Sequence, residues 1–464
     1  MNNQLKQQLG LFSAVMVVIS AMIGSGVFKK IAPMSNELNS SMMVLAAWAV
    51  AGVITWMGSL SNAEVAGLIA QPGGQYVYFR NMYGKLFAFL FGWSSFSVIQ
   101  TSTAAAVAYI FAESLNSLIP LPELPADIAN ITLFSSPDFS LMPFHNFGVK
   151  SVACLLVIIL SVINYRGIEY GERISNIFGV TVVVGVLTII IIGFIKGSQP
   201  LQSISQSAEA AQGFSISAFF TAMMAAFWAY EGWNNVGFLA GEIKNPKRNI
   251  PIALGLGTLI VMALYTTVNA AFYKMADVDF YKEVSGQSNT IAAVAGMQQV
   301  WEYGALFISG LILVSTLNST NNSLMSAPRI YYAMACDKLF FDKASHTHHK
   351  YKTPHKAIIM QMFWCVMLII SGSFDMLTEM LVFVAFIFYG CGAFGVIILR
   401  KKMPGSERPF KVPLYPVLPV LFSLFSLALV INTLIESPVK SAIGLGLVAT
   451  GLPLYFLLNK KAKP

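Results

Sequence analysis

Ionisable residues are scarce in this chain. Only 11% of its 464 residues are Asp, Glu, Lys or Arg, and 56% are hydrophobic, whereas an ordinary soluble domain is about 25% charged. This composition excludes a typical soluble protein. Apolar runs of about 20 residues, the length that crosses a ~30 Å hydrocarbon core, recur along the whole chain. The sequence therefore predicts an all-α polytopic membrane protein.

Cysteine and histidine are also rare. The four cysteines lie in or beside apolar runs and show no paired spacing: Cys154, Cys336, Cys365 and Cys391. All five histidines lie outside the apolar runs, and we find no phosphate loop and no nucleophile with a base at helical spacing. These absences argue against an enzyme and predict no cofactor and no metal ion. A metal site among His346, His348 and His349 is the weaker alternative to a solvated basic loop.

Twelve apolar runs are long enough to be membrane spans. They lie near residues 11–33, 42–64, 86–118, 148–164, 174–195, 214–241, 250–273, 303–335, 357–372, 377–399, 414–435 and 437–458. Most of the 29 lysines and arginines fall in the segments on one side of these spans, the side that holds both chain ends. Because cytoplasmic loops carry the excess of positive charge, we expect cytoplasmic N- and C-termini. The net charge of +8 then needs no nucleic-acid partner, and anionic lipid headgroups are its natural counterpart.

A proline-rich segment divides the chain unequally. Residues 403–419 contain five prolines and are expected to link the tenth span to the eleventh. We therefore predict a ten-helix transport core over 1–402, with inverted repeats at about 9–196 and 212–400. The linker and two appended helices occupy 403–464.

The first span contains residues that disfavour a helix in hydrocarbon. Gly24-Ser25-Gly26 lies in its middle, and each glycine costs about 1 kcal/mol relative to alanine. Non-helical backbone survives at membrane depth only where protein or a polar cavity satisfies its N–H and C=O groups. The break therefore suggests a binding site. Close helix packing, which small residues permit, is the alternative.

The sixth span carries a second interruption, five spans after the first. Glu231, Gly232, Asn234 and Asn235 interrupt an otherwise apolar run. In transporters built from inverted repeats, matching breaks in the two halves point to the binding site. An ionisable group at membrane depth also usually marks a substrate or ion path. Two breaks at matching places favour a site over packing alone.

Each predicted break offers both signs of partial charge. The half-helix after a break presents N–H groups, and the half-helix before it presents carbonyl groups. A zwitterion such as an amino acid fits this pair, with its carboxylate on the N–H groups of Ser25, Gly26 and Val27. Its ammonium group is expected on carbonyl groups near Met22, Trp228, Ala229 and Glu231. The side chain of Trp228 or Tyr230 would then lie over the ligand as a gate.

Three motifs resemble those of the amino acid/polyamine/organocation superfamily. They are IGSGVF at 23–28, QPGGQYVY at 71–78 and GEIKNPKRNIP at 241–251, in the right order over nearly the whole chain. The run FWAYEGWN at 227–234 is most similar to the L-type amino acid exchanger branch. The resemblance implies twelve transmembrane helices with a 5+5 inverted repeat, broken helices 1 and 6, and alternating access.

The resemblance also implies which residues form the site. The backbone of Gly24, Ser25 and Gly26 would bind the substrate carboxylate, and the aromatic side chain of Trp228 would be the gate. The expected substrate-binding set is Met22, Gly24, Ser25, Gly26, Val27, Trp228, Ala229, Tyr230, Glu231 and Gly232. Candidate pocket walls, from placement in the chain alone, are Gln100, Thr101, Asn234, Phe383 and Phe386.

The source of energy for transport depends on the polar residues of the fifth and eighth spans. Many relatives carry a lysine in the fifth span, whereas residues 174–195 contain no charged residue, so a lysine-based proton scheme is in doubt. The eighth span offers oxygen ligands that suit a hard cation. These are Ser315, Thr316, Asn318 and Ser319. Hydrogen bonding from helix to helix is the alternative role for the same residues.

Two carboxylates have predicted roles. Relatives commonly have glycine or an apolar residue at the position of Glu231, so its carboxylate is expected to titrate with transport or to pair with a cationic substrate side chain. Capping of the half-helix after Gly232 is the alternative. Glu242 is expected to form inner-gate ion pairs with the basic residues at 244–248, and a solvated loop is the rival interpretation.

These features predict a secondary active amino acid transporter, an exchanger, in a bacterial inner membrane. Its partners would be an amino acid substrate and membrane lipids, without an accessory subunit. Two alternatives remain open. One is a proton- or sodium-coupled symporter of amino acids or polyamines, and the other is a transporter-like membrane nutrient sensor.

Overall fold

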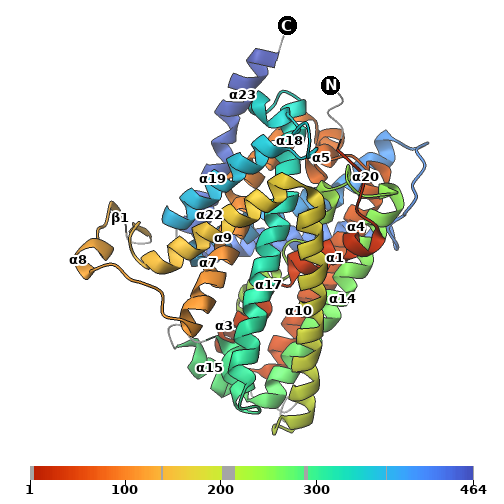
Figure 1. The fold of residues 1–464 in the computed structure, drawn as a ribbon. Helices are drawn as coiled ribbons and strands as arrows, with labels where there is room; N and C mark the ends of the chain where they lie inside the picture. Colours follow the sequence, from red (N-terminus) through yellow and green to blue (C-terminus); the bar gives the residue numbers. More distant parts are fainter. Residues whose placement is uncertain (1–4, 137–138, 201–214, 287–290, 372–373, 463–464) are drawn as a thin grey trace.

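The chain is almost entirely helical in the computed structural model, which describes residues 5–136, 139–200, 215–286, 291–371 and 374–462. One small antiparallel hairpin, β1 (Phe134–Ser136) and β2 (Phe139–Leu141), lies in the loop before the fourth span. The two chain ends lie at the same end of the bundle (Figure 1). That end, which holds Leu5 and Ala462, is called the terminal face below. The opposite end, where α15 lies, is called the far face.

The first five predicted spans correspond to helices of the first half of the chain. These are α1 (Leu11–Met22), α2 (Gly26–Lys29), α3 (Ile31–Leu38), α4 (Ser41–Leu68), α5 (Gln75–Tyr83), α6 (Lys85–Ser94), the π-helix η1 (Ser95–Ile99), α7 (Gln100–Leu118), the short α8 (Ala126–Ala129), α9 (Phe147–Arg166) and α10 (Ile168–Lys196). The fifth span begins six residues before its predicted start, at Ile168 rather than 174. In its polar first turns, the acidic side chains of Glu169 and Glu172 bond to the N-terminal part of the chain.

The second half holds the remaining seven spans. Its helices are α12 (Ile216–Ala229), α13 (Asn235–Phe238), α14 (Pro246–Met275), α15 (Val278–Ser285), α16 (Ala292–Gln298), α17 (Gly304–Ser326), α18 (Pro328–Cys336), the 3-10 helix η2 (Asp342–Ser345), α19 (His355–Ser371), α20 (Phe374–Lys402), α21 (Val417–Glu436), α22 (Pro438–Ala449) and α23 (Gly451–Ala462). Within the described chain, nine helical stretches are long and apolar enough to cross a membrane. The shorter α12 and α19 and the polar-rich α17 complete the twelve, so the predicted all-α, twelve-span fold is confirmed.

The two halves of the chain interlock around the first span. α1 packs against α10 from its own half and against α14 and α17 from the other half, and α4 packs along α14. Figure 1 shows α10, α14 and α17 running the length of the bundle, with α1 beside them. Because its neighbours enclose it, α1 is buried along nearly its whole length. An interruption in α1 is therefore surrounded by protein rather than by lipid.

A buried carboxylate ties the proline-rich linker to the core. Glu64, near the end of α4, accepts hydrogen bonds from Arg400 Nε at 2.8 Å, Arg400 Nη2 at 2.7 Å and the Val412 N–H at 2.8 Å. Arg408 Nε lies 3.2 Å from the same carboxylate. α21 then packs on both α20 and α4. The linker is thus held against the core, and a division of the chain after residue 402 stays a prediction.

Candidate functional site

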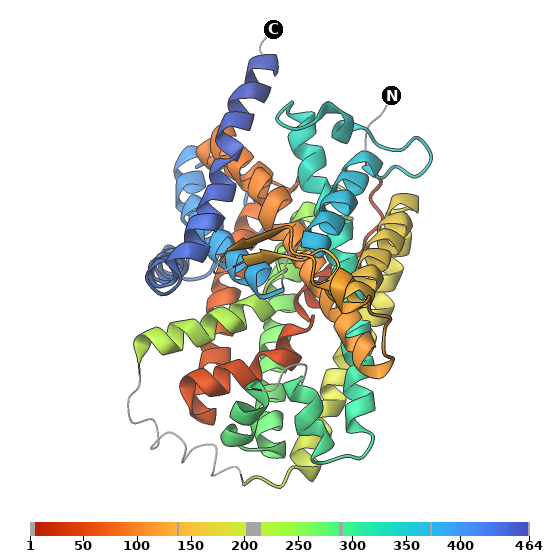
Figure 2. The ribbon, with the colours of Figure 1, turned by 90° about the vertical axis from the view of Figure 1, so that its left-hand side faces the viewer.

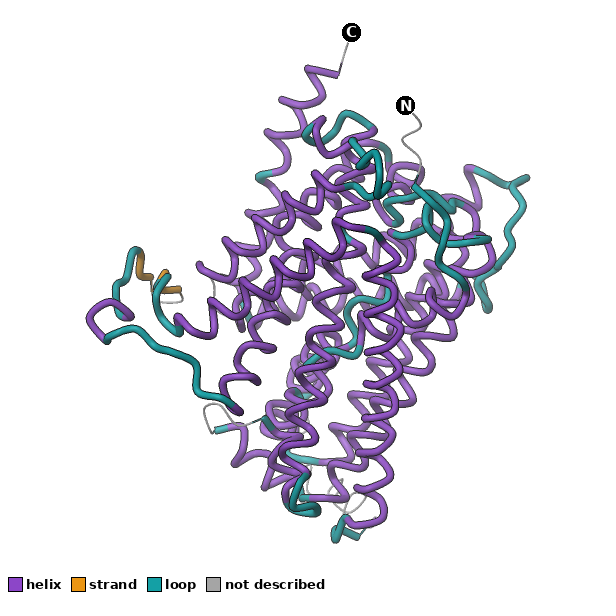
Figure 3. Tube along the Cα trace, viewed as in Figure 1, coloured by secondary structure: helices purple, strands orange, loops and turns teal. Residues whose placement is uncertain are grey.

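The first predicted break is present in the structure. α1 ends at Met22, the Gly24 N–H donates to the Met22 carbonyl at 2.8 Å, and helix resumes only at Gly26. The chain then continues through Lys30 into α3 with little change of direction, since the Lys30 N–H donates to the Gly26 carbonyl at 2.9 Å. Figure 2 shows the red chain leaving helical geometry between these pieces. Non-helical backbone also appears inside the bundle in Figure 3, as well as at its two ends.

The second break lies where the sixth span was expected to be interrupted. α12 ends at Ala229 and α13 begins at Asn235. Between them Gly232 has φ +105°, a conformation that other residues rarely adopt. Any side chain here would be strained, and a β-carbon would also lie 2.8 Å from the Ala21 carbonyl oxygen. Glycine at this position therefore allows the second break to touch the first helix.

The two breaks lie against each other. A β-carbon on Gly26 would lie 2.6 Å from the β-carbon of Ala229 and 3.1 Å from the Trp228 ring. Gly26 of the first span thus lies against the end of α12, and Gly232 of the sixth span lies against the end of α1. The substrate-binding residues proposed from the sequence at 22–27 and 228–232 are brought into one place. Their role in binding stays a prediction.

Hydroxyl groups from two neighbouring helices approach the bared carbonyl groups. The Tyr265 hydroxyl on α14 lies 2.8 Å from the Met22 carbonyl oxygen and 3.1 Å from that of Ala229. Ser315 Oγ on α17 lies 2.8 Å from the Ile23 carbonyl oxygen. A carbonyl oxygen has two lone pairs. Those of Ile23 and Ala229 can therefore still accept from a ligand, whereas that of Met22 already accepts from the Gly24 N–H and from the Tyr265 hydroxyl. Tyr265 was not identified from the sequence, where a tyrosine in the apolar seventh span carries no distinguishing pattern.

The donor side of the first break is less satisfied. Ser25 precedes α2, and the first N–H groups of a helix have no partner within that helix. The Ser25 hydroxyl is fully buried and has no hydrogen-bond partner among the described residues. Buried polar groups are almost always paired. An anionic ligand group at this point would accept hydrogen bonds from the unpaired hydroxyl and from the bared N–H groups.

The carboxylate of Glu231 is buried beside the second break. The Tyr389 hydroxyl on α20 donates to its Oε1 at 2.5 Å, and the Trp233 ring packs on Tyr389 with centroids 5.3 Å apart. The residue that precedes α13 is Asn234, not Glu231, so the capping alternative does not describe the position of Glu231. The Asn234 side-chain oxygen instead accepts from Asn62 Nδ2 at 2.7 Å. Tyr389 and Asn62 are further residues that sequence reasoning missed.

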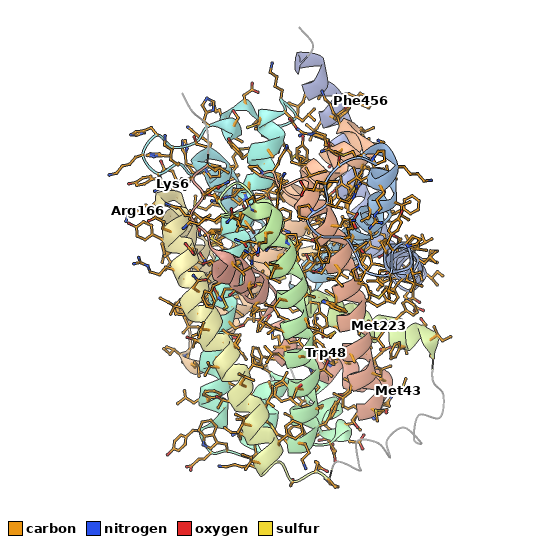
Figure 4. All side chains as sticks on the ribbon, turned by 90° about the vertical axis from the view of Figure 1, so that its right-hand side faces the viewer. Lys6, Met43, Trp48, Arg166, Met223 and Phe456 are labelled. Atoms are coloured by element: carbon orange, nitrogen blue, oxygen red, sulfur yellow. The ribbon has the colours of Figure 1, made fainter. Side chains whose placement is uncertain are left out.

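A cavity leads from the far-face half of the molecule to Trp228. Its volume is about 340 Å³, and its lining includes Lys30, Met34, Trp228, Phe383 and Glu436. The Lys30 ammonium lies 5.1 Å from the centre of the Trp228 ring. Figure 4 places Met223 of α12 and Met43 of α4 in the same half of the bundle, away from the chain ends. Trp228 therefore stands between this cavity and the two breaks.

The other candidate wall residues are dispersed. Phe386 packs on Phe227 with ring centroids 4.6 Å apart, next to Tyr389. Gln100 is buried, with a side-chain carbonyl that has no partner among the described residues. Thr101 donates to the Phe96 carbonyl at 2.6 Å, and its own carbonyl accepts the Cys365 thiol of α19 at 3.5 Å. Neither of these two hydrogen bonds is with α1 or α12.

The polar band of α17 bonds partly to the first span and partly within α17. Ser315 reaches the first break, as described above, and Ser319 Oγ donates to the Ala21 carbonyl at 3.3 Å. Thr316 bonds within its own helix, to the Ile312 carbonyl at 2.7 Å, and the Asn318 carbonyl accepts from the side chain of the next turn. The contacts of both serines support the helix-bonding alternative. In the described part of the chain, no group of three or more His, Cys, Asp or Glu residues is arranged to hold a metal ion.

A buried ion pair lies on the terminal-face side. Arg329 of α18 donates to the Glu242 carboxylate from Nε at 2.8 Å and from Nη2 at 2.7 Å, and both side chains are at most 2% exposed. The expected ion pairs of Glu242 with the basic residues at 244–248 were therefore wrong, because the carboxylate pairs with Arg329, which is distant in the sequence. The N-terminal segment is also bonded to this region through its backbone, since Leu9 pairs with Ile243 in a parallel β-bridge.

Comparison with known proteins identifies the family of the chain. The family model described as amino acid permease matches residues 9–456. The chain belongs to the amino acid permease family. It is 30% identical to the serine/threonine exchanger SteT of Bacillus subtilis (strain 168), over 99% of this chain and 98% of that protein. It is also 30% identical to the human b(0,+)-type amino acid transporter 1, over 98% and 88% of the two chains. Against the human cystine/glutamate transporter the identity is 26%, over 98% and 85%.

Membership of this permease family gives the contact between the breaks a testable consequence. Gly26→Ala places a methyl group against Ala229, so the two interrupted spans must separate. We expect amino acid uptake into proteoliposomes to fall at least tenfold. Gly310→Ala on α17 is the control, because nothing lies within 4 Å of a β-carbon there. Equal uptake by both variants would show that the close approach is not needed.

The ion pair on the terminal-face side predicts a change in local opening. Glu242→Gln leaves the Arg329 charge buried and unpaired, and breaking such a pair costs about 3–5 kcal/mol. The N–H groups of Gln8 and Leu9, which donate to the Glu242 carbonyl at 2.8 and 2.9 Å, should then exchange hydrogen at least tenfold faster. Hydrogen exchange followed by mass spectrometry measures this. Glu436→Gln, in the far-face cavity, should leave these amides protected, and unchanged exchange in Glu242→Gln would exclude a closing role.

Proposed function

We propose that this chain is an amino acid exchanger that moves its substrate by alternating access. The observation that carries the proposal is the contact between two interrupted membrane helices, which presents bared N–H and carbonyl groups at one point. Relatives over nearly the full length of the chain are named as a serine/threonine exchanger and as amino acid transporters. Their names support amino acids as the substrate class.

In this proposal the backbone holds the substrate at both poles. The carboxylate lies on the N–H groups of Ser25, Gly26 and Val27, beside the unpaired Ser25 hydroxyl. The ammonium group donates to the carbonyl groups of Met22 and Ala229, in place of the Tyr265 hydroxyl that lies within hydrogen-bond distance of both. The same arrangement fits any α-amino acid, because it reads only the common backbone of the substrate.

The described conformation then corresponds to one step of the cycle. The cavity reaches Trp228 from the far-face half, whereas Glu242 and Arg329 close the other side. Movement of Trp228 would admit the substrate to the breaks, and rupture of the ion pair would release it on the terminal-face side. Exchange requires that the empty transporter returns slowly, so that a second amino acid must occupy the site first.

Further aspects of the setting belong to the same proposal. The excess of lysine and arginine on the terminal-face side supports cytoplasmic chain ends in a bacterial inner membrane. We also propose that the chain works without an accessory subunit, because the described cysteines are unpaired and three of them, Cys154, Cys365 and Cys391, lie within spanning helices. Sodium or proton coupling and a sensor role are the outcomes that the next experiment separates from exchange.

Counterflow into proteoliposomes tests the proposal. Vesicles preloaded with an unlabelled amino acid should accumulate the labelled one at least tenfold faster than empty vesicles. The rate should not change when sodium is replaced by choline or when the pH gradient is collapsed. Accumulation that needs sodium or a pH gradient but no internal amino acid would establish a symporter instead. Binding without any accumulation would establish a sensor.

The Glu231 carboxylate should control either pH dependence or the preference for cationic substrates. Glu231→Gln keeps the hydrogen bond with Tyr389 and removes the charge, so we expect one of these two properties to be lost. Exchange of lysine against alanine at pH 5.5 and pH 7.5 measures both. Glu231→Asp, which keeps the charge, is the control. If Glu231→Gln shows the wild-type pH profile and the wild-type ratio of lysine to alanine, the carboxylate has neither role.

A further inference from the structure

A crevice lies between α9 and α10, close to the turn that joins these two helices. Its volume is about 300 Å³, and it is lined by Ile163, Tyr170, Arg173, Ile174, Ile177 and Phe178. Arg173 is the one charged residue of this lining, and the other five are apolar or aromatic. We propose that the crevice binds an acyl chain of an anionic phospholipid, whose phosphate group pairs with Arg173.

The apolar part of the lining faces the bilayer. Tyr170 is 54% exposed and Ile177 is 58% exposed, and α10 is long and apolar enough to span the membrane. A helix rises 1.5 Å per residue, so the stretch from 170 to 178 extends along the helix axis for roughly 12 Å. A hollow of this length on a lipid-facing surface suits a hydrocarbon chain, because water gains no hydrogen bonds from its walls.

The charged end of the crevice lacks a protein counter-ion. Arg173 is exposed and makes no ion pair or hydrogen bond with any residue that the structure describes, and the same is true of Arg166 at the end of α9. The acidic residues of the same turns point elsewhere. Glu172 accepts from Ser13 Oγ at 2.5 Å, and Glu169 accepts from Gln8 Nε2. The first turns of α10 thus direct their acids toward α1 and their arginine toward lipid.

The position along the membrane normal also fits a headgroup. Figure 4 labels Arg166 and Lys6 at the end of the bundle that holds the chain termini, which is the side with the excess of basic residues. Tyr170 belongs to a residue type that concentrates at membrane–water interfaces. Lysine and arginine near the surface attract anionic lipids. A lipid whose phosphate lies at Arg173 and whose acyl chain runs toward Phe178 would have its headgroup at the interface and its chain in the hydrocarbon.

Lipid binding to the purified full-length protein tests the proposal. Native mass spectrometry during titration with phosphatidylglycerol or phosphatidylcholine gives the affinity for each lipid. The wild type should bind phosphatidylglycerol more tightly than phosphatidylcholine. Arg173→Gln should weaken the tightest phosphatidylglycerol binding about fivefold and leave phosphatidylcholine unchanged. Arg173→Lys, which keeps the charge, should retain most of the affinity.

Two other variants separate this site from general surface attraction. Ile177→Trp fills the crevice and should weaken phosphatidylglycerol binding although Arg173 is intact. Lys196→Gln removes an exposed charge at the other end of α10 and should have no effect. The proposal is overturned if Arg173→Gln binds phosphatidylglycerol as the wild type does, if Lys196→Gln weakens it equally, or if the wild type binds both lipids equally well.

Discussion

The need to pair every backbone polar group inside a membrane governs this structure. An unpaired N–H or C=O group in hydrocarbon costs several kcal/mol, so a helix can be interrupted only where other groups replace the lost bonds. Here the replacement comes from neighbouring helices. Hydroxyl groups of Tyr265, Ser315 and Ser319 reach the carbonyl groups of the first break. The enclosing position of α10, α14 and α17 around α1 is thus a condition for having a break at all.

The same requirement explains why the donor side differs from the acceptor side. Protein hydroxyl groups satisfy carbonyl oxygens at the first break, whereas the Ser25 hydroxyl has no described partner next to the start of α2. A site whose carbonyl groups are largely satisfied and whose donors are not discriminates in favour of a ligand that brings an anionic group. The ligand's cationic group then adds to carbonyl oxygens that are already partly satisfied. Substrate binding would therefore depend more on the carboxylate than on the amine.

The sequence predicts features that depend on residues within one segment, such as polar residues inside an apolar run. It does not predict contacts between residues that are far apart in the sequence. The twelve spans follow from composition and length, and the breaks follow from glycine, a carboxylate and asparagines inside apolar runs. Tyr265 and Tyr389 were missed because tyrosine is ordinary in a membrane helix, and only the fold shows that their hydroxyl groups meet Met22 and Glu231. The partner of Glu242 was wrong for a related reason. Sequence proximity suggested 244–248, but α18 places Arg329 at the carboxylate.

The position of Tyr265 makes the two breaks interdependent. Its hydroxyl lies within hydrogen-bond distance of carbonyl groups on both interrupted spans, yet it carries one proton and can donate fully to only one of them at a time. An ammonium group has three donors, so it can satisfy both carbonyl groups together. A bound amino acid would therefore hold α1 and α12 together more firmly than Tyr265 alone. If the substrate strengthens the contact between the two interrupted helices in this way, an occupied site and an empty site favour different arrangements of the bundle. A slow return of the empty transporter would then make exchange obligatory.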